Sequence, residues 1–293
     1  MKIGVIFPQT EFKPDPIAVR DYAQAVEGLG FTHMHAYDHI LGANPDRPGG
    51  WTGTYTFQHS FFEPFILFGY LAGLTRSIEF ATGILILPQR QTPVVAKQAA
   101  TLDVLCNGRL RLGVGVGWNE VEYIALGENF HNRGKRMEEQ VALLRMLWTQ
   151  PLVKFEGRWH NIPDAGINPL PVQRPIPIWF GGMDERALQR MTSIGDGWML
   201  NIRTIEQAHL KLDNLNQYLE AAGRDKASFG IDSRLNMNLI KPDEWISFMQ
   251  TWEELGATHL TVNTMGCGYE TTSAHIEALK RFAEIIGLSK WLY

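Results

Sequence analysis

Cysteine is rare in this sequence. Cys106 and Cys267 are the two cysteines among 293 residues, and they do not form a CxxC pair. This scarcity argues against a disulfide framework and against a cysteine-rich zinc site. It is typical of proteins that work in a reducing compartment, so a cytoplasmic location is expected.

Long apolar segments and an excess of basic charge are also absent. The most apolar stretch, residues 61–74, is interrupted by Glu63 and Pro64 and is shorter than the roughly 20 residues that a membrane-spanning helix needs. The N-terminal MKIGVIFPQT runs directly into charged residues, unlike a secretion signal. The formal net charge of -4 gives no field that would attract nucleic acid or anionic lipid. Neither a membrane nor a nucleic acid is therefore expected as a partner.

The residues that are present indicate a globular α/β protein. Hydrophobic residues make up 45% and charged residues 20% of the chain, which suits one large packed core. Apolar residues at 137, 141, 144 and 148 follow helical spacing, with charged residues between them. Eight short apolar runs alternate with such segments and are candidate strands: residues 3–7, 32–37, 78–87, 110–116, 176–180, 198–200, 229–239 and 259–263.

Strands that alternate with helices predict βαβ units and a parallel sheet. Eight such units at this length favour a closed (β/α)8 TIM barrel over an open doubly wound sheet, and we expect one domain over residues 1–293. Two connections are longer than a barrel requires: residues 40–60 after strand 2 and residues 151–175 between strands 4 and 5. The first, rich in Gly, Pro and aromatic residues, is expected to cover the site, and the proline-rich second is expected to be a surface insertion.

Residues that follow the strands converge at the mouth of a parallel barrel, so functional residues are sought there. His39, beside Asp38 after strand 2, is a candidate because an imidazole can donate a hydrogen bond or a proton to a ligand. A capping or packing role for His39 is also open. The other mouth positions are Pro8, Gln9, Pro88, Gln89, Trp118, Asn119, Glu120, Gly181, Gly182, Asn201, Asn263 and Thr264.

Two glycine-containing segments near the mouth have more than one interpretation. GVGVGWNE, residues 113–120, has Trp118 where a dinucleotide-binding fingerprint requires glycine, so a Rossmann site is not predicted. Its glycines either admit a flat or phosphorylated ligand or relieve crowding inside the barrel. Gly181 and Gly182 precede a helix that begins near Asp184. That helix start could bind phosphate, or Asp184 could simply be its N-cap.

A metal-hydrolase site is the rival interpretation of strand 2. His33 and His35 share one face of that strand, and a His-x-His pair opens such sites on barrels. Further ligands must then come from later strands, but IPIWF and WML of strands 5 and 6 offer apolar side chains. No metal site is therefore predicted.

Three longer segments carry a resemblance to a known family. In their order and spacing, ILPQRQTPVVAKQAATLDVLCNGRLRLGVGVGWNEVEY, RPIPIWFGG and GDGW resemble the bacterial luciferase-like monooxygenase family, including its deazaflavin-dependent oxidoreductase branch. The resemblance spans nearly the whole chain. It implies a (β/α)8 barrel that binds reduced FMN or the deazaflavin coenzyme F-420 at the C-terminal ends of the strands. It also implies a homodimer formed by barrel helices, such as the apolar segment 61–74.

The resemblance implies roles for individual residues. Asp38 and His39 match a pair in the deazaflavin enzymes, where the histidine lies near the reactive ring, whereas FMN-type luciferases tend to have Glu-His-His there. Gly83 and Ile84 match the family's bulge, where a non-prolyl cis peptide backs the ring. The residues expected to line the cofactor and substrate pocket are Gln89 or Thr92, Gly115, Gly117, Asn119, Glu120, Gly181 and Gly182.

Two positions depart from the family pattern. Asp184 stands where Ser or Thr is common, which puts phosphate binding at that loop in doubt. Trp118 stands where sugar-phosphate dehydrogenases of the deazaflavin branch have a catalytic Glu, so that substrate class is disfavoured.

Three functions are open. The first is hydride transfer between coenzyme F-420 and a small organic substrate, with His39 as proton donor or ring-polarising group. The second is a two-component monooxygenase, in which a separate reductase supplies reduced FMN and Trp51, Tyr55 and Phe57 of the 40–60 loop exclude water. The third is a non-catalytic flavin-binding barrel. Oxygen uptake separates the first two, because reduced FMN reacts readily with oxygen and deazaflavin does not.

Overall fold

A closed ring of parallel strands forms the centre of the computed structural model, which describes residues 1–11, 14–202 and 204–288. The strands are hydrogen-bonded in the order β3-β2-β1-β11-β10-β9-β8-β5-β4, and an additional pairing of β3 with β5 closes the ring. Each pairing in the ring is parallel. The strands are β1 (Lys2–Ile6), β2 (His33–Ala36), β3 (Glu79–Thr82), β4 (Leu85–Ile86), β5 (Leu110–Gly115), β8 (Ile178–Phe180), β9 (Gly197–Met199), β10 (Gly230–Asn236) and β11 (His259–Asn263).

The predicted (β/α)8 barrel is confirmed, with one change in its third strand. The apolar pattern predicts one strand over residues 78–87, but β3 and β4 share that position. They are separated by Gly83–Ile84, whose peptide bond is cis, as the resemblance to the family implies. Ala81 pairs with Arg111 of β5, and Leu85 pairs with Val114. Three residues between Ala81 and Leu85 therefore lie opposite two residues of β5. The break is therefore a β-bulge, with one residue more than its partner strand.

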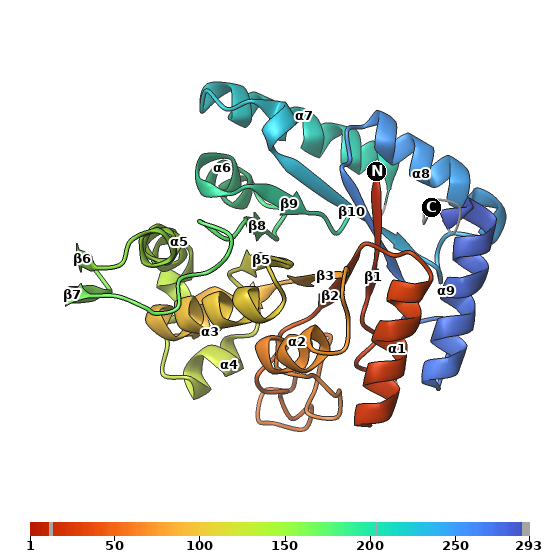
Figure 1. Ribbon diagram of the computed structural model, residues 1–293, viewed down its shortest axis with the longest axis horizontal. Helices are drawn as coiled ribbons and strands as arrows, with labels where there is room; N and C mark the ends of the chain where they lie inside the picture. Colours follow the sequence, from red (N-terminus) through yellow and green to blue (C-terminus); the bar gives the residue numbers. More distant parts are fainter. Residues whose placement is uncertain (12–13, 203, 289–293) are drawn as a thin grey trace.

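Helices cover the outside of the ring, as the alternating pattern predicts (Figure 1). The apolar positions 137, 141, 144 and 148 are all buried. Prolines occupy the first turn of α1, α2 and α3, where a missing backbone N–H is tolerated. The helices are α1 (Pro16–Gly28), α2 (Pro64–Ala72), α3 (Thr92–Leu105), α4 (Glu120–Ala125), α5 (Arg133–Thr149), α6 (Glu185–Ile194), α7 (Ile205–Ala221), α8 (Trp245–Glu254) and α9 (Thr272–Ile286), with short 3-10 turns η1 (Leu87–Gln89), η2 (Phe130–Asn132), η3 (Lys226–Ser228) and η4 (Pro242–Glu244). No helix in the described ranges is long and apolar enough to cross a membrane.

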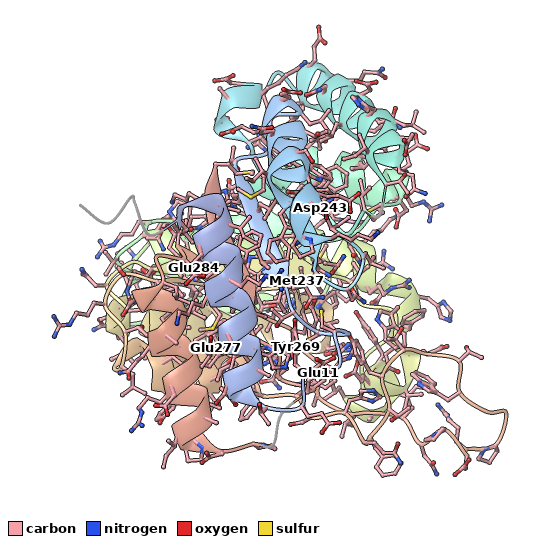
Figure 2. All side chains as sticks on the ribbon, turned by 90° about the vertical axis from the view of Figure 1, so that its right-hand side faces the viewer. Glu11, Met237, Asp243, Tyr269, Glu277 and Glu284 are labelled. Carbon is pink, nitrogen blue, oxygen red and sulfur yellow. The ribbon has the colours of Figure 1, made fainter. Side chains whose placement is uncertain are left out.

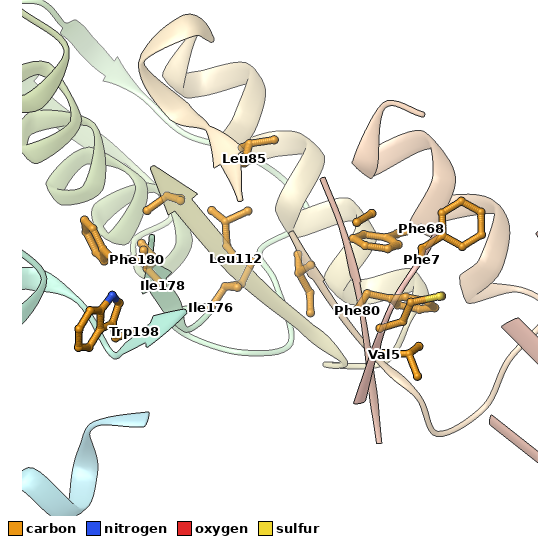
Figure 3. Close-up of a cluster of buried hydrophobic side chains, with 14 of the residues drawn as sticks. Val5, Phe7, Phe68, Phe80, Leu85, Leu112, Ile176, Ile178, Phe180 and Trp198 are labelled. Carbon is orange, nitrogen blue, oxygen red and sulfur yellow. The ribbon is translucent and has the colours of Figure 1, made fainter. Parts of the chain in front are cut away.

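The hydrophobic core lies between the strands and this layer of helices (Figure 3). Leu112, Ile178 and Phe180 of neighbouring strands are buried in it. Phe68 of α2 stacks on Phe80 of β3 with ring centroids 5.0 Å apart. Each such side chain contributes about 1.5–3 kcal/mol by leaving water, so this layer holds the ring rigid and presents the strand ends at defined positions.

The two long connections differ in structure. Residues 40–60 contain no regular strand or helix, but a β-bridge joins Ala43 to Thr56. Residues 151–175 contain an antiparallel hairpin, β6 (Val153–Glu156) and β7 (Asn161–Ala165), which forms a sheet of its own outside the ring. Figure 1 shows this hairpin at the outer edge of the molecule, which confirms the surface insertion.

Candidate functional site

His39 lies at the C-terminal end of the ring, directly after β2, with a side chain that is 9% exposed. Its Nδ1 is 3.3 Å from each carboxylate oxygen of Glu122 on α4. Because a carboxylate only accepts hydrogen bonds, Nδ1 must carry the hydrogen. No residue in the described ranges hydrogen-bonds to Nε2 of His39. That nitrogen is therefore available to a ligand, as an acceptor when the ring is neutral and as a donor when it is protonated.

Glu122 organises the surroundings of His39. Its side chain is fully buried and accepts hydrogen bonds from the backbone amides of Ile40 at 2.8 Å and Leu41 at 3.2 Å. The amide of the Gln89 side chain is a further donor, at 3.4 Å. Burial would raise the pKa of Glu122, but the hydrogen bonds, led by that from His39, outweigh burial and lower the pKa. Glu122 is thus an ionised anchor for His39 and for the start of the 40–60 loop.

Aromatic rings surround the imidazole of His39. The ring centroids of Phe61, Tyr55 and Trp118 lie 4.9, 5.1 and 5.6 Å from that of His39. Trp51 extends the group, with its ring 5.7 Å from Trp118. Burial raises the pKa of Tyr55 to about 12. The 40–60 loop thus packs over the mouth and gives His39 an apolar, nearly dry environment.

Asp38 makes structural contacts. Its carboxylate accepts a hydrogen bond from the backbone amide of Ile86 at 3.0 Å and pairs with Arg90 at 2.7 Å. Arg90 also pairs with Glu63 at 2.8 Å. Burial raises the pKa of Asp38, and Arg90 and the Ile86 amide oppose that rise. These contacts join the end of β2 to β4 and to the start of α2, beside His39.

The bulge explains two glycines that were expected to face the cofactor. A Cβ on Gly115 would lie 2.5 Å from Cδ1 of Ile84, and one on Gly181 would lie 3.0 Å from Cγ2 of Ile84. Ile84 also packs against a buried cluster that includes Trp179 and Met199. Of the two interpretations of these glycines, relief of crowding around Ile84 is the one with observed contacts.

Gly117 and Gly182 are required by their backbone conformation. Gly117 has φ +64° and Gly182 has φ +114°, both in the region that favours glycine. A Cβ on Gly182 would also lie 2.9 Å from Cβ of Ala187. Asp184 is the N-cap of α6, because its side chain accepts a hydrogen bond from the amide of Ala187 at 2.9 Å. The N-cap interpretation of Asp184 is therefore confirmed.

Asn119 and Gln89 differ in whether a side-chain atom is left to hydrogen-bond with a ligand. Asn119 caps α4 by accepting from the amide of Val121 at 3.1 Å, and it donates to the carbonyl of Leu41 at 3.4 Å. Gln89 uses its amide nitrogen on Glu122, while its buried Oε1 has no hydrogen-bond partner in the described ranges. An unpaired buried acceptor is costly, so Gln89 Oε1 fits a donor on a bound molecule.

A charged groove of about 1280 Å³ adjoins the Gly181–Gly182 loop. Its acidic side chains already have partners: Asp184 caps α6, Glu138 pairs with Arg190 at 2.9 Å, and Glu185 accepts from Tyr218 at 2.6 Å. Among described residues the lining cations without a carboxylate partner are Arg133, Lys135 and Arg186. The four cationic side chains of the lining face three carboxylates, so the groove has a net charge of +1.

The opposite end of the ring holds a buried polar cluster, which we call the barrel floor and which consists of His33, His35, Arg111 and Asp232. Asp232 Oδ2 lies 3.1 Å from His35 Nε2 and 3.6 Å from both His33 Nε2 and Arg111 Nη2. Burial lowers the pKa of both histidines. The three partners keep the pKa of Asp232 far below its usual value although burial acts in the other direction.

Sequence reasoning missed Glu122, Arg90, Arg111 and Asp232. Glu122 lies two residues beyond the mouth positions considered, in the first turn of α4, where a helix facing the mouth can return a side chain to it. Asp232 belongs to strand 7, whereas the ligands for the His33–His35 pair were sought on strands 5 and 6. Alternation along 230–236 would have placed Asp232 on the inner face.

Comparison with known proteins matches residues 1–237 to the model of the luciferase-like monooxygenase family. An uncharacterized protein of Mycobacterium tuberculosis is 31% identical over 275 residues, which cover 89% of this chain and 92% of that protein. The F420-dependent hydroxymycolic acid dehydrogenase of the same organism is 30% identical over 231 residues, 78% of this chain and 60% of that protein. The FMNH(2)-dependent dimethylsulfone monooxygenase of Pseudomonas putida is 34% identical over 143 residues, 47% of this chain and 39% of that protein.

Solved structures share the fold. An F420-dependent secondary alcohol dehydrogenase in complex with an F420-acetone adduct superposes with a TM-score of 0.79 at 17% identity and covers 98% of both chains. The family match spans most of the chain, and the barrel, the cis peptide in the third strand and the histidine after the second strand agree with the sequence resemblance. This chain therefore belongs to the luciferase-like monooxygenase family.

Proposed function

We propose that this protein is an oxidoreductase that transfers a hydride between coenzyme F-420 and a small organic substrate at the mouth of the barrel. The observation that carries the proposal is the His39–Glu122 pair inside its aromatic enclosure. Relatives that are named as F420-dependent dehydrogenases support it. Coenzyme F-420 supplies a hydride-carrying ring carbon when it is bound.

His39 acts on a proton in this proposal. Glu122 holds the hydrogen on Nδ1, so Nε2 is the atom that gives a proton to the substrate or takes one from it. The neighbouring carboxylate stabilises the imidazolium form during that exchange. Asp38, which is engaged by Arg90 and Ile86, serves to position the end of β2 rather than to react.

The residues present fit the cofactor. Gln89 Oε1 is a buried, unpaired acceptor that suits an N–H on the edge of a flavin-like ring. Arg133, Lys135 and Arg186 give the groove beside Gly181 and Gly182 spare positive charge. A phosphate, which both cofactors carry, suits that charge. The longer match to the F420-dependent dehydrogenase, 78% of this chain against 47% for the FMNH(2)-dependent enzyme, favours F-420 over FMN.

The aromatic enclosure also bears on the substrate. Tyr55, Phe61 and Trp118 offer apolar surface around the one nitrogen available for proton transfer. A small apolar or ring-containing molecule that carries an alcohol or carbonyl group suits this surface, because its polar group can reach His39 while the rest contacts the rings. Water exclusion by the same rings would protect the reaction.

A monooxygenase that uses reduced FMN from a separate reductase is the second candidate. The match to the dimethylsulfone monooxygenase favours it, as does the enclosed environment of His39. The same residues would then shield an oxygen-dependent reaction from water. A homodimer remains part of both proposals.

Equilibrium titration under anaerobic conditions tests the two candidates. The protein is titrated with F-420, with oxidised FMN and with reduced FMN, and binding is followed by fluorescence and absorbance. We expect selective binding of F-420, several-fold weaker in Lys135→Ala and Arg186→Ala at low salt and unchanged in Lys154→Ala, an exposed lysine on β6. Selective binding of reduced FMN, followed by oxygen uptake, would instead establish the monooxygenase.

A further inference from the structure

The barrel floor contains side chains that the proposed reaction does not use. His33 and His35 extend from β2, and Asp232 extends from β10, which is three strands away around the ring. One ligand atom from each, two imidazole nitrogens and one carboxylate oxygen, lie within 4.8 Å of one another. All three residues are buried. This donor set belongs to the chain itself and is independent of the mouth.

The two distances from Asp232 to the histidines of the barrel floor are compatible with a shared ligand. Donors about 2.1 Å from a metal lie about 3.0–3.4 Å apart at octahedral or tetrahedral angles. Asp232 Oδ2 is 3.1 Å from His35 Nε2 and 3.6 Å from His33 Nε2. The 3.1 Å pair does not form a hydrogen bond of acceptable geometry, and both atoms lack any other hydrogen-bond partner in the described ranges. The two atoms are close to each other but are not directed at each other.

The hydrogen bonds around His33 also leave one of its ring nitrogens for a metal. Thr261 Oγ1 donates to Asp232 Oδ1 at 2.7 Å, and Thr32 Oγ1 donates to the carbonyl of Ile3 at 3.0 Å. Each hydroxyl has one hydrogen, so both oxygens can only accept from His33, which lies 3.0 Å from each. In a neutral ring Nδ1 donates to Thr32, and the lone pair of Nε2 then has no donor while Thr261 gives its hydrogen to Asp232.

Arg111 provides an independent observation. Its guanidinium is buried, stacks 4.3 Å over the ring of Trp179, and has three nitrogens without a hydrogen-bond acceptor in the described ranges. Nη2 is 3.6 Å from Asp232 Oδ2, too far for a hydrogen bond. A metal-bound hydroxide or a small anion at an open coordination position would give these donors an acceptor and would offset the positive charge of Arg111.

We propose that the barrel floor binds one divalent transition metal through Nε2 of His33, Nε2 of His35 and Oδ2 of Asp232, with a hydroxide or small anion facing Arg111. Two imidazoles and one carboxylate suit Zn²⁺, Fe²⁺ or Co²⁺ better than Mg²⁺ or Ca²⁺, which prefer oxygen. The metal joins β2 to β10 and so strengthens the closed ring. Thr32 and Thr261 are the outer-shell partners that orient the ligands.

A pocket lies beside the barrel floor, at the same end of the ring. A pocket of about 480 Å³ is lined by Trp179, His259, Pro175, Pro177 and Phe229. His259 lies with its ring 5.3 Å from that of His33, and Trp179 contacts Arg111. Two side chains that line the pocket are therefore in contact with the barrel floor.

Metal titration of the tag-free, EDTA-treated protein tests the proposal without any cofactor or substrate. Zn²⁺ binding is measured by calorimetry and Co²⁺ binding by its visible absorption. We expect one equivalent to bind and to raise the melting temperature, with Asp232→Asn and His35→Gln abolishing both effects. His259→Gln, at the same end of the ring but not a ligand, should bind as the unchanged protein does.

Two further measurements keep the result decisive. If the ligand variants do not fold, Thr261→Val leaves all three ligands in place and should weaken binding about 10–100-fold. Less than one equivalent bound by the unchanged protein, or full binding by Asp232→Asn, would overturn the proposal. Either result leaves the proposed reaction at the mouth unaffected, because that site shares no residue with the barrel floor.

Discussion

At the scale of single residues, the mouth depends on side chains whose hydrogen bonds are already assigned. Glu122 receives hydrogen bonds from His39, Ile40, Leu41 and Gln89, so one buried carboxylate sets both the tautomer of the histidine and the path of the loop. The effect of changing Glu122 should therefore differ from that of changing an exposed carboxylate outside the site.

We expect Glu122→Gln to bind cofactor nearly as tightly but to react about 10–100-fold more slowly, because a hydrogen bond to a charged group contributes about 1.5–3 kcal/mol. The amide can present N–H to His39, which moves the ring hydrogen to Nε2. Nitrogen NMR of the imidazole should show the change in tautomer. Glu156→Gln, an exposed position on β6, is the control, and an equal effect there would contradict the role of Glu122.

The Arg90 pair is a stability prediction at the same scale. Removing Arg90 leaves Asp38 buried beside the Ile86 amide without its cation. Arg90→Leu should therefore lower the free energy of unfolding by about 3–5 kcal/mol, measured by urea denaturation at neutral pH. Arg20→Leu breaks an exposed pair with Asp21 and should leave the same quantity nearly unchanged.

At the scale of elements, the bulge between β3 and β4 determines which residues β5 can have. Ile84 occupies the space that a Cβ atom at position 115 or 181 would need. Gly113 is constrained differently, because its Cβ would lie 2.0 Å from the backbone carbonyl of Thr82. A side-chain tip can move aside, whereas the backbone of a paired strand cannot.

We expect Gly113→Ala to destabilise the protein more than Gly115→Ala, as measured by urea denaturation. Gly115→Ala should keep the fold but weaken cofactor binding, because Ile84 is displaced within the bulge. Ile84→Val removes the Cδ1 atom that lies 2.5 Å from the added methyl, so the double variant should regain binding. Failure of that rescue would mean that Gly115 faces the ligand directly.

At the scale of the whole molecule, closure of the ring buries several histidines near the last strands. Burial lowers the pKa of His275 on α9 to about 4 and that of His259 on β11 to about 3. Glu11 and Tyr269, both labelled in Figure 2, lie next to His275. Glu11 Oε2 is 3.7 Å from Nε2 of His275, and the ring centroid of Tyr269 is 5.4 Å from that of His275. Both histidines are neutral in the folded protein at neutral pH.

Acid should therefore destabilise the fold in a defined range. In the unfolded chain a histidine takes up a proton near pH 6.5, whereas the folded state resists until about pH 4, so stability falls as pH decreases between those values. Each such histidine contributes at most about 1.4 kcal/mol per pH unit. Urea unfolding from pH 7.5 to 5 measures the slope. His275→Gln should reduce it, and the exposed His209→Gln should leave it unchanged.

The sequence by itself determined the barrel and the position of His39. The alternation of strand and helix periods depends only on neighbours along the chain. In any parallel barrel the C-terminal ends of the strands meet at one mouth, whatever the side chains are. The N-cap at Asp184 was one of two open interpretations of a short segment, and the cis peptide at Gly83–Ile84 was implied by the resemblance to the family.

Only the tertiary structure decided what His39 and the His33–His35 pair contact. Glu122 is 83 residues from His39 in the chain, and Asp232 comes from a strand three places away from β2 in the ring. The β3–β5 closure and the extra residue of the bulge set which of these side chains point to a common centre. Such contacts depend on the register of distant strands, which no local pattern encodes.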